Sequence, residues 1–272
     1  MLAAILRSLR TGVVTTRYPE QPSEPPPRFR GAPRIRPGAA FETLAPPSVC
    51  PTGAISVSDS GYSIDIGRCV FCGQCVRDSP DSAIEMGREF ELSARDRRSL
   101  IVEVERNSDG HAAQLPSLPP DDHIAAQIRG VLGHSLHLRH LDSGSCNACD
   151  WERAALLNPV YDIRRLGIDF VASPRHADGV MVTGPVTRNL ETAVHRTFEA
   201  VPEPRIVIAV GACATSGGIV GRSYASAGGL GEVLPVDVFI PGCPPRPESI
   251  IFGILLAVGR LRERIREPQN GC

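Results

Sequence analysis

The chain reads LHLRHLDSGSCNACD over residues 136–150, and this segment decides the fold of its second half. A short run over 136–141 is closed by Asp142, and a Ser-Gly-Ser loop then leads directly to Cys146 and Cys149. Short apolar runs that end in this way are typical of strands in a mostly buried parallel sheet. The segment therefore predicts a strand that delivers two thiols at its carboxyl end.

The same order of strand and cysteine occurs twice more. The run over 205–210 is followed by Cys213, and the run over 236–240 is followed by Cys243. Two more apolar runs, at 168–172 and 179–182, predict further strands. Crossover helices that would connect the strands are predicted at 150–158, 189–200 and 247–266. This half of the chain is predicted to be a doubly wound, flavodoxin-like α/β domain with a parallel sheet of four or five strands.

Such a sheet would bring the scattered cysteines together. Because ligands in open α/β sheets gather at the carboxyl ends of the strands, Cys146, Cys149, Cys213 and Cys243 are expected to meet at one edge. Four thiolates are the ligand set of an iron–sulfur cluster. The alternative is a flavodoxin-like domain with buried structural cysteines, which predicts no link between cysteine position and strand end.

A second group of cysteines is more compact. Cys69, Cys72 and Cys75 form a C-x-x-C-x-x-C run, the spacing with which bacterial ferredoxins wrap three thiolates around a 4Fe–4S cluster. The fourth ligand in such proteins is a distant cysteine followed by proline, and Cys50 before Pro51 supplies it. A zinc site and disulfides are the alternatives. Zinc usually takes two well-separated pairs of ligands, and disulfides need an oxidising compartment, for which no secretory signal is visible.

The positions that would bind the second cluster of a ferredoxin hold no cysteine. Counted by the ferredoxin spacing, they are Ala40, Thr43, Pro46 and Ser79. All four ligands of one cluster are missing while all four of the other are present, which random cysteine loss would not produce. We interpret residues 37–106 as an α+β, ferredoxin-like domain that kept one of its two clusters.

Length and composition fit two domains. The chain has 272 residues, of which 42 % are hydrophobic and 22 % charged, as is usual for globular proteins. A segment rich in Asn, Ser, Gly and Pro predicts a linker, after which Asp121 or Asp122 is placed to cap a helix beginning near His123. The predicted order is a basic extension over 1–36, the ferredoxin-type domain over 37–106, the linker over 107–122, the α/β domain over 123–266 and a tail over 267–272. Cys272, in the tail, is expected to be a free thiol.

Charge is unevenly distributed along the chain. The net charge of −1 suggests no nucleic-acid partner. Residues 1–37 nevertheless hold seven arginines against Glu20 and Glu24, and the leucines and isoleucine of the first turns fall near one helical face. We expect these turns to lie on a membrane surface or a membrane subunit; a targeting peptide is the alternative. No run approaches the ~20 apolar residues that span a bilayer, so attachment is expected to be peripheral or through partners.

Five motifs of the second half resemble one family. They are SCNACDWE over 145–152, SPRHAD over 173–178, TGPVTR over 183–188, GACA over 211–214 and VDVFIPGCPP over 236–245. Residues from about Ile124 to Arg262 are similar to the small subunit of membrane-bound NiFe hydrogenases of the formate hydrogenlyase type, which is related to the 20 kDa subunit of respiratory complex I. The complex I subunit uses adjacent cysteines as its first two ligands, whereas Cys146 and Cys149 have hydrogenase spacing.

The first half resembles a different subunit of the same complexes. The motifs TRYP over 16–19, FRG over 29–31, CP over 50–51 and CVFCGQC over 69–75 look like the ferredoxin-type subunit that complex I and formate hydrogenlyase place beside the small subunit. That relative normally holds two clusters. The chain thus resembles a fusion of neighbouring subunits, and tethering raises the effective concentration of one cluster near the other.

The resemblance implies an electron-transfer subunit with two 4Fe–4S clusters, one on each cysteine set. It implies a large partner, either a NiFe hydrogenase large subunit or a complex I 49 kDa-like subunit. Membrane subunits would contact the N-terminal segment, and an electron donor or acceptor protein would complete the assembly at the cytoplasmic face of the membrane. The hydrogenase is favoured. The alternatives are a complex I-like NADH:quinone oxidoreductase module that donates electrons to quinone, and a zinc-stabilised structural adaptor.

Three details near the cysteines complete the predictions. The resemblance makes Glu152 a candidate for a proton path, and stabilisation of the helix N-terminus is the other interpretation. The single tryptophan, Trp151, is expected to exclude water from the cluster or to pack against the sheet. Backbone amides of the glycine-containing loops at 144–145, 211–212 and 241–242 are expected to donate hydrogen bonds to cluster sulfurs.

Overall fold

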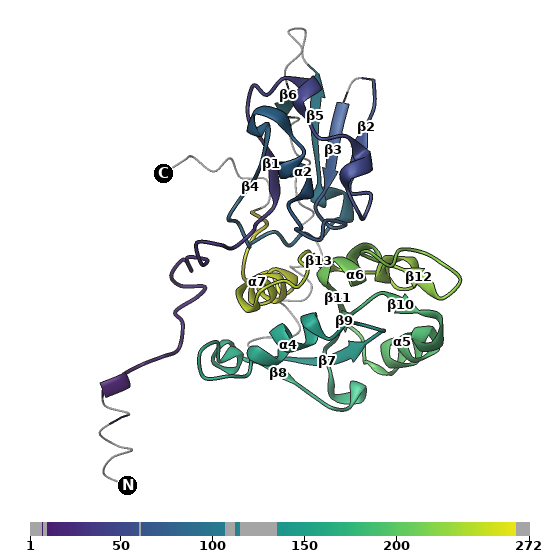
Figure 1. The fold of residues 1–272 in the computed structure, drawn as a ribbon. Coiled ribbons are helices and arrows are strands. Elements are labelled where there is room, and N and C mark those ends of the chain that lie inside the picture. The colour runs from purple at the N-terminus through teal and green to yellow at the C-terminus, as the bar shows by residue number, and fades with distance from the viewer. Residues whose placement is uncertain (1–6, 8–9, 60, 107–111, 115–134, 265–272) are drawn as a thin grey trace.

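The main sheet of the second half is parallel, and the sheets of the first half are antiparallel (Figure 1). The computed structural model describes residues 7, 10–59, 61–106, 112–114 and 135–264. We call the described residues of 33–114 the antiparallel module and residues 135–264 the parallel module. The predicted amphipathic start, most of the linker, the helix near His123 and Cys272 lie outside the described residues.

The parallel module contains a five-stranded sheet within its described residues, in the order β13-β11-β9-β7-β8. Counted along the chain this is the order 2-1-3-4-5, which is the flavodoxin-like doubly wound arrangement. The strands are β7 (Leu136–Asp142), β8 (Ile168–Phe170), β9 (Gly179–Thr183), β11 (Ile206–Val210) and β13 (Val238–Ile240). All five predicted strands and the parallel α/β fold are therefore confirmed.

Helices cover both faces of this sheet. The fully buried β11 sends Ile206, Ile208 and Val210 into one core cluster and Val207 and Ala209 into the other, as the two-residue period of a strand requires. The first face packs against α4 and α7, and the second against α5 and α6. The helices are α4 (Ala148–Ala155), α5 (Arg188–Ala200), α6 (Gly211–Ser216) and α7 (Pro247–Ala257).

Two helix boundaries differ from the prediction. The first crossover helix, expected over 150–158, begins at Ala148, so that Cys149 is itself helical. The last helix, expected to continue to 266, ends at Ala257. Gly259 then takes a left-handed conformation with φ of 68°, which glycine adopts without strain and which stops the helix. The chain then turns toward the antiparallel module, where Arg264 forms an ion pair with Glu91 (2.5 Å).

Short segments complete the parallel module. A two-stranded antiparallel ribbon joins β10 (Val186–Thr187) and β12 (Ser226–Gly228). Three 3-10 helices lie in the connections: η5 (Ile163–Leu166), η6 (Pro174–His176) and η7 (Leu230–Glu232).

The antiparallel module is built from a four-stranded sheet, β2-β3-β5-β6, and a two-stranded sheet, β1-β4, among its described residues. The strands are β1 (Pro33–Ile35), β2 (Ile55–Val57), β3 (Gly61–Asp65), β4 (Ile84–Met86), β5 (Ile101–Arg106) and β6 (Ala112–Gln114). The helices are the 3-10 helices η1 (Phe41–Thr43), η2 (Pro47–Val49), η3 (Pro80–Ser82) and η4 (Arg97–Leu100), and the short α-helix α2 (Gln74–Arg77).

Two of these strands lie outside the segment predicted to hold the first domain. β1 falls within the predicted extension over 1–36, and β6 falls within the predicted linker over 107–122. Both are edge strands. β1 pairs with β4, which is distant in sequence, and β6 pairs with β5, the strand before it in the chain. Because such pairing depends on backbone hydrogen bonds, it leaves no apolar period in a three-residue segment.

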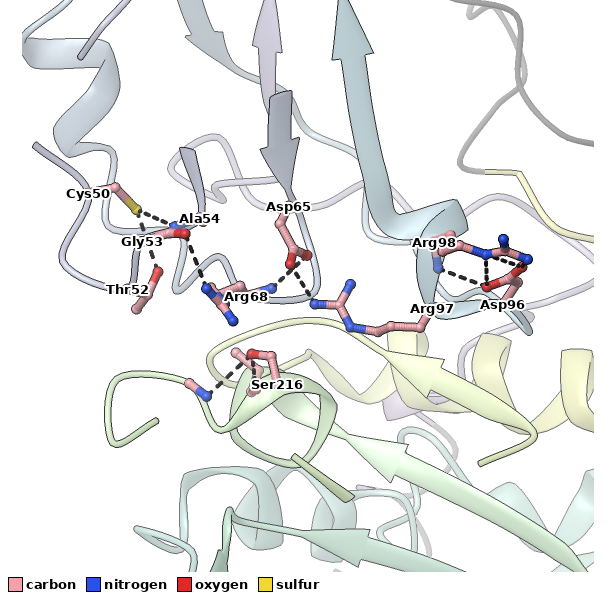
Figure 2. Close-up of polar contacts among 12 residues, drawn as sticks. Cys50, Thr52, Gly53, Ala54, Asp65, Arg68, Asp96, Arg97, Arg98 and Ser216 are labelled. Carbon is pink, nitrogen blue, oxygen red and sulfur yellow. Dashed lines mark hydrogen bonds and ion pairs between the residues drawn. The ribbon is translucent and has the colours of Figure 1, made fainter. Parts of the chain in front are cut away.

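The two modules are joined by backbone pairing. Ala94 of the antiparallel module and Phe239 of β13 exchange two backbone hydrogen bonds, of 3.0 and 2.8 Å. This contact covers the outer edge of the parallel sheet, which would otherwise expose unpaired donors and acceptors. Asp65 at the end of β3 and Arg97 of η4 form an ion pair (2.6 Å) on the side of the antiparallel module that faces α6 (Figure 2).

The segment before β1 crosses the parallel module. The amide of Thr16 donates to the carbonyl of Val160 (2.7 Å). Tyr18 is buried in the same core cluster as the apolar side chains of α7, and its ring meets Phe90 edge-on at 5.6 Å. Described residues of the predicted extension are thus part of the packed structure. Among the residues that the structure describes, no helix is both long and apolar enough to cross a bilayer.

Gly253 gives a test of the contact between α7, β13 and the antiparallel module. A Cβ atom added there would lie 2.4 Å from Cδ1 of Ile240 and 2.9 Å from Oγ of Ser93. Overpacking of this kind costs about 1–3 kcal/mol. Gly253→Ala is therefore expected to lower the denaturant midpoint in chemical unfolding followed by circular dichroism. Gly231→Ala, where the added Cβ has no neighbour within 4 Å, is the control, and equal midpoints in the two variants would contradict this packing.

Candidate metal centres

The first cysteine set lines one cavity of the antiparallel module. Cys50 caps the C-terminus of η2, Cys69 and Cys72 lie in the loop after β3, and Cys75 lies in α2. All four line a cavity together with apolar side chains such as Ile64 and Met86. The structure therefore places Cys50 within reach of the C-x-x-C-x-x-C loop, as the sequence predicts.

Hydrogen bonds and mutual repulsion set the electrostatics of this set. Burial acts to raise the pKa of Cys50, but hydrogen bonds from Thr52 and the amide of Ala54 (3.2 Å) outweigh it and leave that pKa lowered (Figure 2). Burial raises the pKa of Cys69 to about 12, and the neighbouring thiolates of Cys75 and Cys50 act in the same direction. Each thiolate makes ionisation of its neighbours less favourable. All four thiols can therefore be ionised together only when a cationic centre binds among them.

Three of the four positions of the missing ferredoxin ligands, Ala40, Thr43 and Ser79, are linked by hydrogen bonds. Ser79 is buried, and its hydroxyl donates a hydrogen bond to the carbonyl oxygen of Thr43 (2.8 Å). The amide of Thr43 in turn donates to the carbonyl of Ala40 (3.0 Å). These three positions thus hold small residues whose polar groups are satisfied within the protein, and the loss of a second cluster stays a prediction.

The second cysteine set lies at the carboxyl end of the parallel sheet. Cys146 is in the loop after β7, Cys149 is in α4, Cys213 is in α6 directly after β11, and Cys243 follows β13. Burial raises the pKa values of Cys149, Cys213 and Cys243, that of Cys213 to about 11. In each case charge on other members of the set raises the pKa further, so the four thiols are close enough to repel one another.

The donor sets suit an iron–sulfur cluster, which four thiolates commonly hold. As the described side chains are placed, no three or more Cys, His, Asp or Glu residues form a group that would bind one metal ion. The fit therefore rests on the identity of the donors, their common cavity in the first set and their mutual repulsion in the second. If clusters bind, the eight cysteines would supply the ligands, and the clusters would supply one-electron redox chemistry.

The loops around the second set use their amides differently from the prediction. The amides of Gly144 and Ser145 both donate to Oδ1 of Asp142, at 2.8 and 2.6 Å. The amide of Ala212 donates to the carbonyl of Gly242 (2.8 Å). These three donors hold the loops in shape instead of facing the cysteine sulfurs. In the first set, by contrast, Cys69 accepts a hydrogen bond from the amide of Phe71 (3.3 Å).

Gly211 gives a selective test of the second set. Its φ is +86°, and an added Cβ would lie 2.6 Å from the sulfur of Cys149. Gly211→Ala is expected to displace that ligand and to lower the iron content from about eight to about four atoms per chain, as measured by inductively coupled plasma mass spectrometry. Gly231→Ala is again the matched control. A Gly211→Ala protein with full iron content would rule out this close approach to a bound cluster.

Two side chains of α4 differ in their surroundings. Trp151 is 77 % exposed, so it does not pack against the sheet as expected. Glu152 is half-buried toward α7. Burial raises its pKa, nearby Glu248 raises it further and Arg246 lowers it. Glu152 thus lies beside a second acid and an arginine, and its proposed part in a proton path stays a prediction.

Sequence reasoning missed a polar network behind the first ligand loop. Asp150 accepts hydrogen bonds from the hydroxyls of Ser145 (2.5 Å) and Thr183 (2.8 Å), and Nε2 of His140 lies 2.8 Å from its Oδ1. Ser145 also accepts a hydrogen bond from the amide of Asn147 (3.0 Å). The one signal in the sequence was the position of Asp150 directly after Cys149.

Comparison with known proteins adds a family match. Residues 146–257 match the family described as NADH ubiquinone oxidoreductase, 20 Kd subunit. The chain is 48 % identical over 149 residues to the probable membrane-bound hydrogenase subunit mbhJ of Pyrococcus furiosus, a match that covers 54 % of this chain and 89 % of that protein.

Two further relatives come from different complexes. The chain is 41 % identical over 166 residues to formate hydrogenlyase subunit 7 of Escherichia coli K12, covering 60 % of this chain and 65 % of that protein. It is 43 % identical over 122 residues to an NADH-quinone oxidoreductase subunit of Citrifermentans bemidjiense, covering 45 % of this chain and 69 % of that protein. These relatives are oxidoreductase subunits of hydrogenase and quinone oxidoreductase complexes.

Proposed function

Because the chain belongs to the family of the NADH ubiquinone oxidoreductase 20 kDa subunit and its hydrogenase relatives, we propose that it is an electron-transfer subunit that carries two 4Fe–4S clusters. One cluster would be held by the first cysteine set, Cys50, Cys69, Cys72 and Cys75. The other would be held by the second, Cys146, Cys149, Cys213 and Cys243. The N-terminal cluster would sit in a ferredoxin-type domain that is fused to the small-subunit-like parallel module.

The observation that carries this proposal is the grouping of the eight cysteines. Residues that are far apart in the sequence supply each set. The four cysteines of the first set nevertheless line one cavity, and the thiols of the second set raise one another's pKa values. The backbone pairing of Ala94 with Phe239 also holds the two modules of the chain against each other. Such an arrangement supports a relay in which one cluster exchanges electrons with the other.

A membrane-associated NiFe hydrogenase of the formate hydrogenlyase type is the complex we favour. Two of the relatives named above are hydrogenase or formate hydrogenlyase subunits, and Cys146 and Cys149 have the hydrogenase spacing. A complex I-like module that donates electrons to quinone is the second candidate, favoured by the family match and by the quinone oxidoreductase relative.

The surroundings of the second set support a large partner subunit. Cys146 and Cys243 are exposed, and a cluster held there would face solvent unless another chain covered it. We propose that the large subunit binds over this end of the sheet and completes the catalytic site. The basic N-terminal segment would contact membrane subunits at the cytoplasmic face, and Glu152 would carry protons between the cluster region and that partner.

Metal and sulfide analysis of the anaerobically purified full chain tests the proposal. We expect a brown protein with about eight iron and about eight acid-labile sulfide per chain. A colourless protein with about two zinc per chain and no sulfide would instead establish the structural-adaptor alternative. The sequence of the neighbouring large subunit distinguishes the two complexes, because a hydrogenase partner needs cysteines that bind nickel.

A further inference from the structure

Arg97 lies where the two modules meet, between the segments that carry the two cysteine sets. Its Nη2 forms the ion pair with Asp65, and Figure 2 shows this pair beside α6. A Cβ atom added at Gly67 would lie 2.8 Å from Nη1 of Arg97 and 2.8 Å from Cγ2 of Thr215. Thr215 belongs to α6. The arginine of one module and the threonine of the other therefore meet over Gly67.

Each side of this contact continues directly into a segment that carries cluster ligands. On the first side, the carbonyl of Asp65 accepts a hydrogen bond from the amide of Cys69 (3.0 Å). On the second side, Thr215 follows Cys213 by two residues in the same helix. A shift of the contact would therefore move one ligand set relative to the other.

Two polar atoms at this contact are buried. Among the residues that the structure describes, neither Nη1 of Arg97 nor Oγ1 of Thr215 has a hydrogen-bond partner. Buried polar groups in folded proteins nearly always find a partner. Rotation of Thr215 about its Cα–Cβ bond brings the hydroxyl to the position that the methyl group holds over Gly67. That one rotation gives both atoms a partner across the contact between the modules.

We propose that Arg97 is a positioning residue for electron transfer between the two clusters. The inference rests on the proposed function, since it needs a cluster on each cysteine set. Arg97 donates one hydrogen bond to Asp65 and another to the hydroxyl of Thr215, and it thereby fixes the first ligand loop against α6. Because electron transfer slows steeply as two centres move apart, a fixed separation of the two ligand sets keeps the transfer fast.

Neighbouring residues of the same segment hold the modules together at other elements. Ala94 pairs with Phe239 of β13, and the guanidinium of Arg95 donates to the carbonyl of Leu256 in α7. The modules therefore stay attached when Arg97 is replaced. A substitution at Arg97 thus tests the position of the ligand loop and not the folding of the chain.

The magnetic interaction between the two reduced clusters reports their separation. The full chain is reduced with dithionite, and its electron paramagnetic resonance spectrum is examined for the splitting that two nearby spins cause. We expect resolved splitting in the wild-type chain. Arg97→Gln should lose it, and so should Thr215→Val, which removes the hydroxyl and keeps the shape. Arg98→Gln is the control and should keep it, because Arg98 is the next residue of η4 and pairs with Asp96 at the surface.

Gly67→Ala displaces Arg97 without removing any of its groups. The added methyl group occupies the place where Arg97 and Thr215 meet, so the splitting should again be lost. All of these variants should keep about eight iron atoms per chain. Loss of iron from Arg97→Gln would overturn the inference, because the residue would then hold a ligand set and not the spacing between the sets.

Two further outcomes separate this inference from the proposed function. Unchanged splitting in Arg97→Gln, or no splitting in a wild-type chain that shows two reduced clusters, would overturn the inference and leave the proposed function intact. A wild-type chain with fewer than two cluster signals would overturn the proposed function itself and the inference with it.

Discussion

Replacing Cys213 with serine is expected to remove the second cluster and to leave the first in place. Cys213 lies in α6, directly after β11 at the carboxyl end of the sheet. Burial raises its pKa, and the charges of other members of its set raise it further. A serine hydroxyl is a far weaker iron ligand than a thiolate. Iron should therefore fall from about eight to about four atoms per chain, with a matching loss of sulfide.

Two matched substitutions make this result specific. Cys69→Ser should remove the first cluster and keep the second, because its ligands belong to the antiparallel module. Cys272→Ser, which changes the one cysteine outside both sets, should leave iron and sulfide at their wild-type values. If Cys213→Ser lost both clusters or neither, the division of the cysteines into two independent sets would be wrong.

Replacing Trp151 with glutamate is expected to abolish stable binding of the large partner subunit. Trp151 is 77 % exposed and lies two residues beyond Cys149, on a surface where Cys146 and Cys243 are also exposed. Large exposed aromatic side chains are the usual anchors of protein interfaces. A buried tryptophan anchor contributes about 2–4 kcal/mol, so affinity should fall about 30-fold to several hundred-fold.

Co-purification of the two subunits measures this effect. Val57→Glu is the control, because Val57 is 48 % exposed on β2 of the other module. Both variants should keep their full iron content, which separates loss of binding from loss of the cluster. Equal recovery of the partner with wild-type and Trp151→Glu chains would show that the partner does not use this surface.

The parallel module was largely predictable from sequence because its strands are buried on both faces. A run such as Ile206–Val210 is apolar at every position because both faces of the strand are buried. The glycine and cysteine after it mark the end of the strand. Predicting the strands also predicted that the second cysteine set would lie at one edge of the sheet, since parallel strands deliver their carboxyl ends there. The grouping of the second cysteine set followed from topology before any contact was known.

Features that depend on contacts between distant segments were not predictable. The strand β6 lies in a segment that composition marks as a linker, and it forms only because β5 offers an edge. The pairing of Ala94 with Phe239 and the burial of Tyr18 beside Phe90 leave no periodic signal. The exposure of Trp151 ran against its hydrophobic character, and no apolar period in the sequence around it signals that exposure.

The central claim is that each cysteine set holds one 4Fe–4S cluster, and quantitative electron paramagnetic resonance tests it most directly. The full chain is purified anaerobically, reduced with dithionite and compared with Cys69→Ser and Cys213→Ser. We predict signals of two reduced clusters that together integrate to about two spins per chain, with each variant losing a different one. A single signal in the wild-type chain, or one signal that both variants abolish, would contradict the account.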